Sequence, residues 1–312
     1  MRNITILYDG SSYTYSWIKA MMWAKRDFYN KGFIVKYDSF IDYFPILQRL
    51  NPKQKVKYEE WRLNKALKKS YDIVFLAFHH STTTIGKNKE KRINFLSKLR
   101  KKSKVVCWLD TADSTGSCLF DVLPYVDLYF KKQLLKDRRL YLKELYFDRL
   151  YCQYYHDHFG IVDEKQSNIT NYSLKEDDLR KFRIAWNMGL SDNYFDRKIM
   201  FLRPNRLLFR IYNNCLFANK SIDIHYGGSN PSVYGKVVGF QRSHILELVN
   251  SMEHLMHPDV YKKVPRKMYL NELKNSKTII SPFGWGEVCF RDFEAFIYGA
   301  TLIKPEMEHC ET

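Results

Sequence analysis

The first 130 residues alternate between short apolar runs and amphipathic segments, and this alternation constrains the fold more than any other feature of the sequence. The apolar runs carry little polar alternation, which is typical of strands buried on both faces of a sheet. The amphipathic segments between them have helical spacing and end at glycine or in a basic cluster. Strands joined by helices predict βαβ units, a parallel sheet and right-handed crossovers. The predicted strands of this half are residues 3–8, 33–40, 71–80, 104–113 and 126–132.

The same alternation restarts in the second half of the chain. Strands are predicted at 198–204, 222–228, 278–284 and 300–305, with helices between them. An aromatic and charged segment with no clear strand separates the two halves. A chain of 312 residues is long enough for two domains. We therefore predict an α/β protein with two Rossmann-like doubly wound domains, residues 1–190 and residues 191–312. The second domain is expected to lack its last elements.

Charge and cysteine usage limit the partners and the compartment. The formal net charge is +17 and the hydrophobic share is 45%, so a folded, basic protein is expected. Such a charge suits nucleic acid, an anionic membrane surface or a phosphate-bearing small molecule. The six cysteines form no C-x-x-C pair and no zinc-ligand spacing. We interpret them as reduced, which indicates the cytoplasm.

The stretch SPFGWGEVCFRDFEAFIYGATLIKP, residues 281–305, concentrates glycines and charges between a strand and a helix. Gly284 and Gly286 fall in the turn, where glycine lets a ligand approach the backbone. Glu287, Arg291 and Glu294 are predicted on one face of the helix that follows. An acid there can bind sugar hydroxyls and an arginine can neutralise phosphate. The alternative is a helix N-terminus that favours acids, with Arg291 pairing them.

This segment resembles the donor-binding segment of GT-B glycosyltransferases. In that family an acidic motif E-x7-E is followed by a small residue, a glycine and an apolar strand. Glu294 matches the second acid and Gly299 the glycine, while Gly286 stands at the position of the first acid and Glu287 follows it. The likeness is greatest to bacterial transferases of surface polysaccharide or lipopolysaccharide assembly.

The resemblance implies a fold and a reaction. The two domains would face a cleft, the second holding a nucleotide-sugar donor and the first a glycan or lipid-linked acceptor. Arg203 and Lys304 are added to the donor side, because each lies at the end of a predicted strand. The alternative for the basic residues around Arg203 is a solvated helix face. The nucleotide-sugar is a substrate, so no cofactor is implied. The chain has no D-x-D between strands, and no metal is expected.

Polar residues also follow three strands of the first domain, where an acceptor would lie. The carboxyl ends of strands form the ligand-binding edge of an open α/β sheet. Asp113 is predicted as the general base of an inverting enzyme, with His80 and Asp9 as further candidates. Asp110, Ser114 and Gly10 are assigned to the acceptor-side loops. The alternatives are an Asx turn or helix cap at residues 110–116 and a core or turn histidine at His80.

Two further interpretations stay open. A nucleic-acid-binding protein would use the positive charge and the aromatic residues, although no recognised motif is present and no nucleic-acid partner is expected. An inactive GT-B scaffold would keep the fold without turnover. The basic stretch at residues 87–104 is either a solvated helix face or a peripheral contact with anionic lipid at the inner face of the membrane.

Overall fold

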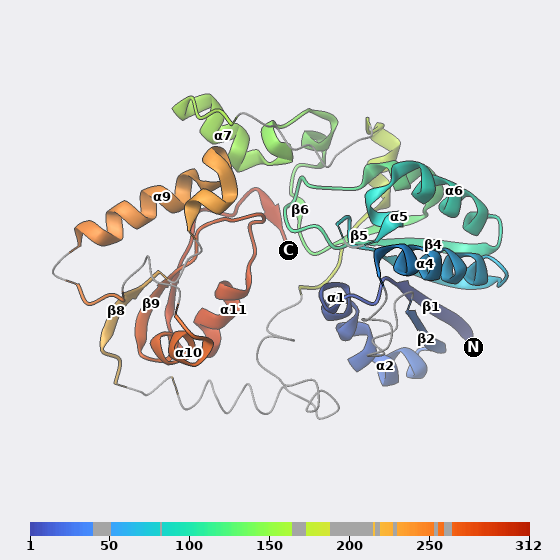
Figure 1. Ribbon diagram of the computed structural model, residues 1–312, viewed down its shortest axis with the longest axis horizontal. Helices are drawn as coiled ribbons and strands as arrows, with labels where there is room; N and C mark the ends of the chain where they lie inside the picture. Colours follow the sequence, from blue (N-terminus) through green and yellow to red (C-terminus); the bar gives the residue numbers. More distant parts are fainter. Residues whose placement is uncertain are drawn as a thin grey trace. The chain divides into compact units, whose positions relative to one another are not determined.

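The computed structural model divides the chain into two compact units (Figure 1). Unit 1 comprises Met1–Glu144, Asn168–Met188 and Cys310–Thr312, and unit 2 comprises Leu145–Ser167 and Gly189–His309. The residues that the structure describes are 1–39, 51–81, 83–163, 173–187, 215, 219–226, 230–252, 255–258 and 264–312. Within those ranges, no helix combines the length and the apolar character needed to cross a bilayer.

Unit 1 is built on a six-stranded sheet in the order β2-β1-β3-β4-β5-β7, and each neighbouring pair is parallel. The register aligns Ile4 with Ile73 and Ile73 with Val105, so apolar residues form continuous rows across the strands. The strands are β1 (Arg2–Tyr8), β2 (Phe33–Ser39), β3 (Tyr71–Ala77), β4 (Ser103–Asp110), β5 (Leu128–Lys131) and β7 (Phe182–Ile184). The predicted parallel α/β fold is confirmed for this unit.

Helices cover both faces of this sheet, as right-handed crossovers require when the strand order reverses at β1. The helices α1 and α2 lie on one side, and α4, α5 and α6 lie on the other (Figure 1). Trp17 and Ile18 of the first helix pack on Ile4 and Ile6 in one core cluster. The helices are α1 (Ser12–Trp23), α2 (Lys25–Asn30), α4 (Pro52–Ala66), α5 (Thr84–Lys87) and α6 (Lys89–Arg100).

Shorter elements also belong to the described part of unit 1. They include the 3₁₀ helices η1 (Phe120–Tyr125), η2 (Arg138–Leu142) and η4 (Glu176–Lys181). The strands β6 (Leu134–Leu135) and β11 (Cys310–Glu311) pair antiparallel, so the last residues of the chain return to this unit.

In the described residues of unit 2, a second parallel sheet has three strands in the order β10-β9-β8. Its strands are β8 (Ile222–His225), β9 (Ser276–Ile280) and β10 (Thr301–Ile303). Its other elements are α7 (Leu150–Phe159), α9 (Gly235–Ser251), α10 (Arg266–Lys274), α11 (Phe290–Ile297), η3 (Tyr146–Asp148) and η6 (Pro231–Tyr234).

One difference from the sequence-based expectation concerns a domain boundary. The sequence pattern places residues 145–163 in the first domain, but Tyr151 and Tyr155 of α7 pack with Val237 and Val238 of α9 in a core cluster of unit 2. The aromatic side chains of this segment find their apolar partners more than 80 residues further along the chain, which no local pattern reveals. The predicted boundary at 190/191 and the predicted elements at 198–204 and 205–219 lie wholly or almost wholly outside the described residues.

Candidate functional site

In unit 1 the polar residues predicted from the sequence do gather at one edge. Parallel strands have their carboxyl ends at the same edge of a sheet, and β1, β3 and β4 are neighbours. Asp9 follows β1, the predicted His80 and its neighbour His79 follow β3, and Asp113 follows β4. The contacts around each residue then decide what it can do.

Asp9 is fully buried and joins two loops. One carboxylate oxygen accepts a hydrogen bond from the backbone N–H of Ser11 at 2.9 Å. The other accepts from the backbone N–H of His79 at 3.0 Å. The carboxylate therefore holds the loop after β1 against the loop after β3. Gly10 beside it has φ 74°, so glycine is favoured there by the backbone conformation of the turn.

Asp110 is also buried, in an ion pair inside unit 1. Lys131 Nζ lies 3.2 Å from its Oδ2, and the hydroxyl of Tyr129 donates to the same oxygen. Burial, and then the charge of Asp110, raises the pKa of Tyr129, which keeps that hydroxyl protonated as a donor. Lys131 also donates to the carbonyls of Ala112 and Ser117, at 2.9 and 3.0 Å. These contacts close the loop after β4, so Asp110 has a structural role.

Asp113 differs because its side chain is 40% exposed. Its Oδ1 accepts a hydrogen bond from the Tyr13 hydroxyl at 2.7 Å and from Lys132 Nζ at 3.2 Å. Burial alone would raise the pKa of Asp113, but Lys132 and Tyr13 outweigh it and lower that pKa. No described residue hydrogen-bonds to Oδ2. The carboxylate is thus ionised, oriented through one oxygen and open to solvent.

Two neighbouring histidines lie beside Tyr13. The rings of Tyr13 and His79 meet edge to face with centroids 4.5 Å apart, and the rings of His79 and His80 are 4.2 Å apart. Burial, and then the proximity of His80, lowers the pKa of His79 to about 4. His79 is therefore a neutral imidazole at pH 7. Its Nδ1 lies 2.8 Å from the hydroxyl of Ser81.

Ser114 is buried in the turn after β4. Its Oγ accepts from the backbone N–H of Ser117 at 2.9 Å and lies 2.8 Å from the Ser117 hydroxyl. These contacts match the turn interpretation of residues 110–116 rather than a contact with an acceptor.

Sequence reasoning missed Tyr13 and Lys132, the two residues that orient Asp113. Lys132 follows β5 at the same sheet edge, so the rule that selected Asp113 would also have selected it. No sequence signal identifies Tyr13, because its contact with Asp113 spans 100 residues.

In unit 2 the predicted residues of α11 and Lys304 lie near the carboxyl ends of strands, together with His225, which the sequence analysis did not select. His225 is the last residue of β8, α11 follows the turn after β9, and Lys304 follows β10. The three strands are parallel, so these positions share one edge of the sheet.

Glu294 is the centre of this group. It is buried, and its Oε2 accepts a hydrogen bond from the Tyr269 hydroxyl at 2.5 Å. Burial raises the pKa of Tyr269, and Glu294 adds to this rise, so the tyrosine remains a donor. Arg291 lies one turn before Glu294, with its guanidinium carbon 5.9 Å from the centroid of the Tyr226 ring. A cation and an oriented carboxylate thus come from one turn of α11.

His225 is absent from the predicted residues, yet it lies in the same group. It is buried, its Nε2 is 3.3 Å from Glu272 Oε2, and its ring meets that of Tyr269 at 5.6 Å. Burial, and then the charge of Arg291, lowers the pKa of His225 to about 4. The sequence analysis could have selected His225 from its position at the carboxyl end of a predicted strand.

Lys304 is committed to an internal ion pair. Its Nζ lies 3.0 Å from Asp292 Oδ2, and the Ser281 hydroxyl donates to the other oxygen at 2.5 Å. The backbone N–H of Cys289 donates to Asp292 at 3.1 Å, which caps the start of α11. Lys304 therefore joins β10 to α11, rather than extending into open space.

The glycine turn is held by side chains of α7 and α9. The carbonyl of Phe283 accepts from Arg242 at 2.8 Å, and that of Gly284 accepts from Tyr151 at 2.6 Å. The carbonyl of Trp285 accepts from Arg149 at 3.1 Å. A Cβ on Gly284 would lie 2.7 Å from a guanidinium nitrogen of Arg242. The absence of a side chain at Gly284 lets the Arg242 guanidinium pack closely on this turn, and the assignment of Gly284 to ligand approach stays a prediction.

Three further residues predicted on the donor side have different outcomes. The helix begins at Phe290, so Glu287 lies in the turn before it and cannot share a helical face with Glu294. Glu287 is fully buried. Gly286 is buried too, and its carbonyl accepts from the Gly284 N–H at 3.1 Å. Arg203 lies outside the described residues.

Comparison with known proteins adds little to this picture. No protein-family model matches the sequence, and no curated protein matches it. A solved structure of LsrB from Clostridium saccharobutylicum in complex with AI-2 is 10% identical, over 97% of this chain and 70% of that chain. Its TM-score of 0.26 carries no argument about fold or function.

Proposed function

We propose that the protein is a GT-B glycosyltransferase, in which unit 2 binds a nucleotide-sugar and unit 1 binds the acceptor. The observation that carries this proposal is the group formed by Glu294, Arg291 and Tyr269 at the carboxyl edge of the second parallel sheet. The motif resemblance rests on the same glutamate. The proposed acceptor is a glycan or a lipid-linked glycan of the cell surface. The proposed place of reaction is the cytoplasm, which the free state of all six cysteines favours.

The chemistry of the group suits a nucleotide-sugar. A buried carboxylate held by a tyrosine hydroxyl is oriented, and it can accept hydrogen bonds from ribose or sugar hydroxyls. The guanidinium of Arg291 can neutralise the negative charge that develops on the leaving nucleotide phosphate. No metal is needed for either role.

The proposed reaction is a displacement at the anomeric carbon of the donor. The bond from that carbon to the phosphate oxygen breaks, and a bond to the acceptor oxygen forms. In an inverting enzyme the acceptor proton passes to Asp113, whose ionised carboxylate is exposed and oriented by Tyr13 and Lys132. In a retaining enzyme Asp113 has no such role. Asp9 becomes a weaker candidate for the base, because it is fully buried and bound to backbone N–H groups, whereas His80 remains a further candidate.

Nucleotide-sugar binding is the first test. The full chain is screened by thermal shift against UDP-, GDP-, CMP- and ADP-sugars, with Glu294→Gln and the exposed-site control Glu306→Gln. We expect one nucleotide class to stabilise wild type and Glu306→Gln, by about 2.7 kcal/mol at a ligand concentration of about 100 Kd. Glu294→Gln should lose this stabilisation. The absence of a shift with every nucleotide-sugar, together with a shift with RNA or DNA, would favour the nucleic-acid interpretation instead.

Turnover is the second test, and it separates an enzyme from an inactive scaffold. Release of the nucleotide from the sugar donor identified by the screen is measured with wild type and Asp113→Asn. For an inverting enzyme we expect Asp113→Asn to bind the donor normally and to lose about 10²- to 10⁴-fold in rate. Donor binding without nucleotide release by wild type, in the presence of cell-envelope acceptors, would indicate a scaffold.

A further inference from the structure

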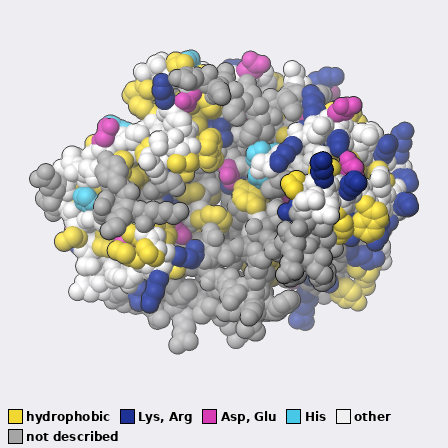
Figure 2. Space-filling model, viewed as in Figure 1, with side chains coloured by type: hydrophobic (Ala, Val, Ile, Leu, Met, Phe, Trp, Pro, Cys, Tyr) yellow, Lys and Arg dark blue, Asp and Glu magenta, His cyan; other side chains and the backbone are white. Residues whose placement is uncertain are grey.

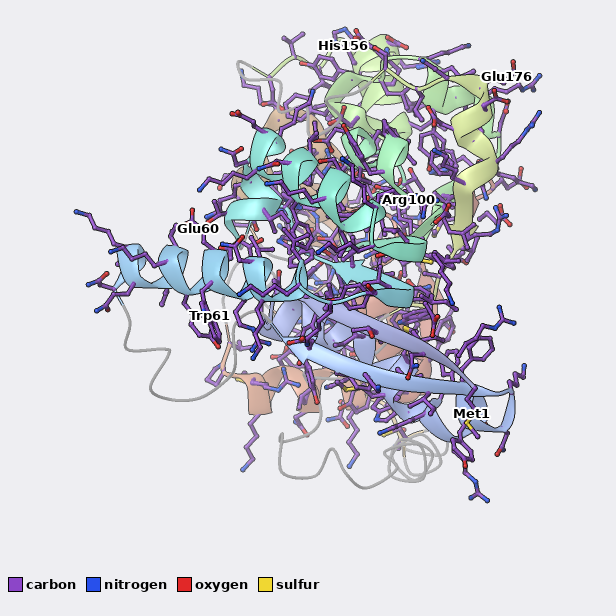
Figure 3. All side chains as sticks on the ribbon, turned by 90° about the vertical axis from the view of Figure 1, so that its right-hand side faces the viewer. Met1, Glu60, Trp61, Arg100, His156 and Glu176 are labelled. Carbon is purple, nitrogen blue, oxygen red and sulfur yellow. The ribbon has the colours of Figure 1, made fainter. Side chains whose placement is uncertain are left out.

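The helix α4 presents an unusual stripe of residues on its outer side. Lys53, Lys57, Trp61 and Lys65 are each four residues apart, so they lie along one face of the helix. All four side chains are exposed, and Trp61 is 52% exposed. Figure 3 shows the Trp61 side chain projecting away from the ribbon of α4. We call these four residues the outer stripe.

The opposite side of α4 attaches the helix to unit 1. Glu59 is buried, and its carboxylate accepts hydrogen bonds from the backbone N–H groups of Thr84 and Ile85, both at 3.0 Å. Arg62 pairs with Asp38. These contacts fix the rotation of the helix, so the outer stripe is held facing outward.

The outer stripe does not contribute to folding in the way the attached side does. Lys53 and Lys57 are like charges at i,i+4, which destabilise a helix. An exposed indole keeps much of its apolar surface in water and forgoes the stabilisation of burial. The Trp61 ring contacts neighbours on the same helix: Lys65 Nζ lies 5.2 Å and the Arg62 guanidinium carbon 6.0 Å from its centroid, and the Tyr58 ring centroid lies 5.6 Å away. These cation–π and ring contacts are of modest strength, and they still leave the indole 52% exposed. An external partner would explain this arrangement better than folding stability does.

The neighbouring basic helix α6 lacks the same combination. Its apolar residues Phe95, Leu96 and Leu99 are buried against unit 1. Its exposed side offers charge from Lys98 and its neighbours, but no aromatic side chain. Figure 2 shows Lys and Arg side chains gathered on the right of the view, over the elements of unit 1. Among the described residues of α4 and α6, the outer stripe therefore combines positive charge with an exposed indole, whereas the exposed side of α6 carries charge alone.

We propose that the outer stripe of α4 docks unit 1 on an anionic membrane surface. Tryptophan favours the headgroup level of a bilayer, and lysines beside it attract anionic lipid. The stripe lies on the convex surface of a helix, which suits a flat membrane. Single-stranded nucleic acid is bound instead in charged grooves with stacking platforms. This proposal does not depend on glycosyl transfer. If the acceptor is lipid-linked, membrane docking would also bring the protein close to its acceptor.

Vesicle co-sedimentation of the full chain tests the proposal. The vesicles contain phosphatidylcholine alone, or phosphatidylcholine and phosphatidylglycerol in equal parts. The test variants are Trp61→Ala and the double variant Lys57→Gln/Lys65→Gln. The matched controls are Trp23→Ala, an indole on α1 that is 47% exposed, and Lys98→Gln/Lys101→Gln on the α6 side. Circular dichroism checks that each variant is folded.

Wild type and both controls should bind the mixed vesicles and not phosphatidylcholine alone. Each lysine removed from the stripe should lower the partition coefficient about fivefold, and Trp61→Ala should lower it by about tenfold.

The proposal would be overturned if wild type did not bind the mixed vesicles, or if both stripe variants bound them as well as wild type does. An equal loss in Lys98→Gln/Lys101→Gln would overturn it in favour of diffuse charge. Binding of single-stranded RNA but not vesicles, lost in Trp61→Ala, would assign the stripe to nucleic acid. Nucleotide-sugar thermal shifts are read separately, so failure here leaves the proposed function intact.

Discussion

At the scale of single residues, three aspartates at one sheet edge have three different environments. Asp9 is bound by backbone N–H groups, Asp110 is paired with Lys131, and Asp113 is exposed and oriented by Tyr13. Asp110 ends a strand, Asp9 and Asp113 follow strands, and all three look equivalent in the sequence. Their neighbours come from other strands and helices, and those neighbours leave Asp113 as the carboxylate available to a substrate.

The buried histidine of unit 2 gives a prediction about pH. The pKa of His225 falls from about 6.5 in the unfolded chain to about 4 in the folded chain. The unfolded state therefore binds more protons between these values, and stability falls as pH drops through this window. Because of His225, the free energy of unfolding should be about 2 kcal/mol lower at pH 5 than at pH 7.

Urea unfolding at pH 7 and pH 5 measures this effect. When the pH is lowered from 7 to 5, the free energy of unfolding of His225→Gln should fall by about 2 kcal/mol less than that of wild type. The reason is that glutamine does not titrate, whereas Glu272 remains in both proteins. The exposed His158→Gln should behave as wild type. The same pH dependence in His225→Gln and wild type would contradict the assigned environment of His225.

At the scale of elements, close backbone contacts position the loops that carry the site. The carbonyls of the turn before α11 are bound by Arg242, Tyr151 and Arg149. In unit 1, α5 packs against the backbone of the loop that carries His79. Both loops are positioned by neighbouring helices, so their geometry depends on residues that would not contact a substrate.

Gly86 of α5 tests this dependence. A Cβ at position 86 would lie 2.1 Å from the backbone oxygen of His79, which is far inside van der Waals contact. Gly86→Ala should destabilise the folded state by about 3 kcal/mol and shift the loop of His79. Thr84→Ala, in the same short helix, adds no atom and should change stability by less than about 1 kcal/mol. Equal stability of the two variants in urea unfolding would show that α5 does not press on this loop.

At the scale of the whole molecule, the two units are not consecutive in sequence. Residues 145–167 belong to unit 2, whereas residues 168–188 and 310–312 belong to unit 1. The helix α7 packs its aromatic residues on α9, and β11 pairs with β6. A cut at one position cannot yield two complete folding units.

A fragment of residues 1–190 makes this measurable. It would keep Tyr151 and Tyr155 of α7 but lose Val237 and Val238, which cover them. The fragment should bind more of the dye ANS than the full chain does, because this apolar face is uncovered. Tyr151→Ser/Tyr155→Ser within the fragment should reduce that binding. A fragment that binds no more dye than the full chain would show that α7 finds other cover.

Local patterns in the sequence suffice for the parallel α/β architecture of unit 1 and for the positions where its strands end. The period of apolar residues distinguishes strands from helices, and the carboxyl ends of parallel strands meet at one edge. For this reason the amino-acid sequence is enough to place Asp113 and His80 at the edge of the first sheet. The same pattern places Glu294 on the helix that follows a strand of the second sheet.

Tertiary contacts, by contrast, determine which of these side chains are exposed and which are paired. The contacts of Asp113 with Tyr13, of Lys304 with Asp292 and of Gly284 with Arg242 join distant segments, and local periodicity carries no information about such pairs. The start of α11 at Phe290 likewise depends on Asp292 capping Cys289 while bound to Lys304 from the end of β10. Long-range packing determines the environment of a side chain, and that environment sets its charge, its orientation and its access to a ligand.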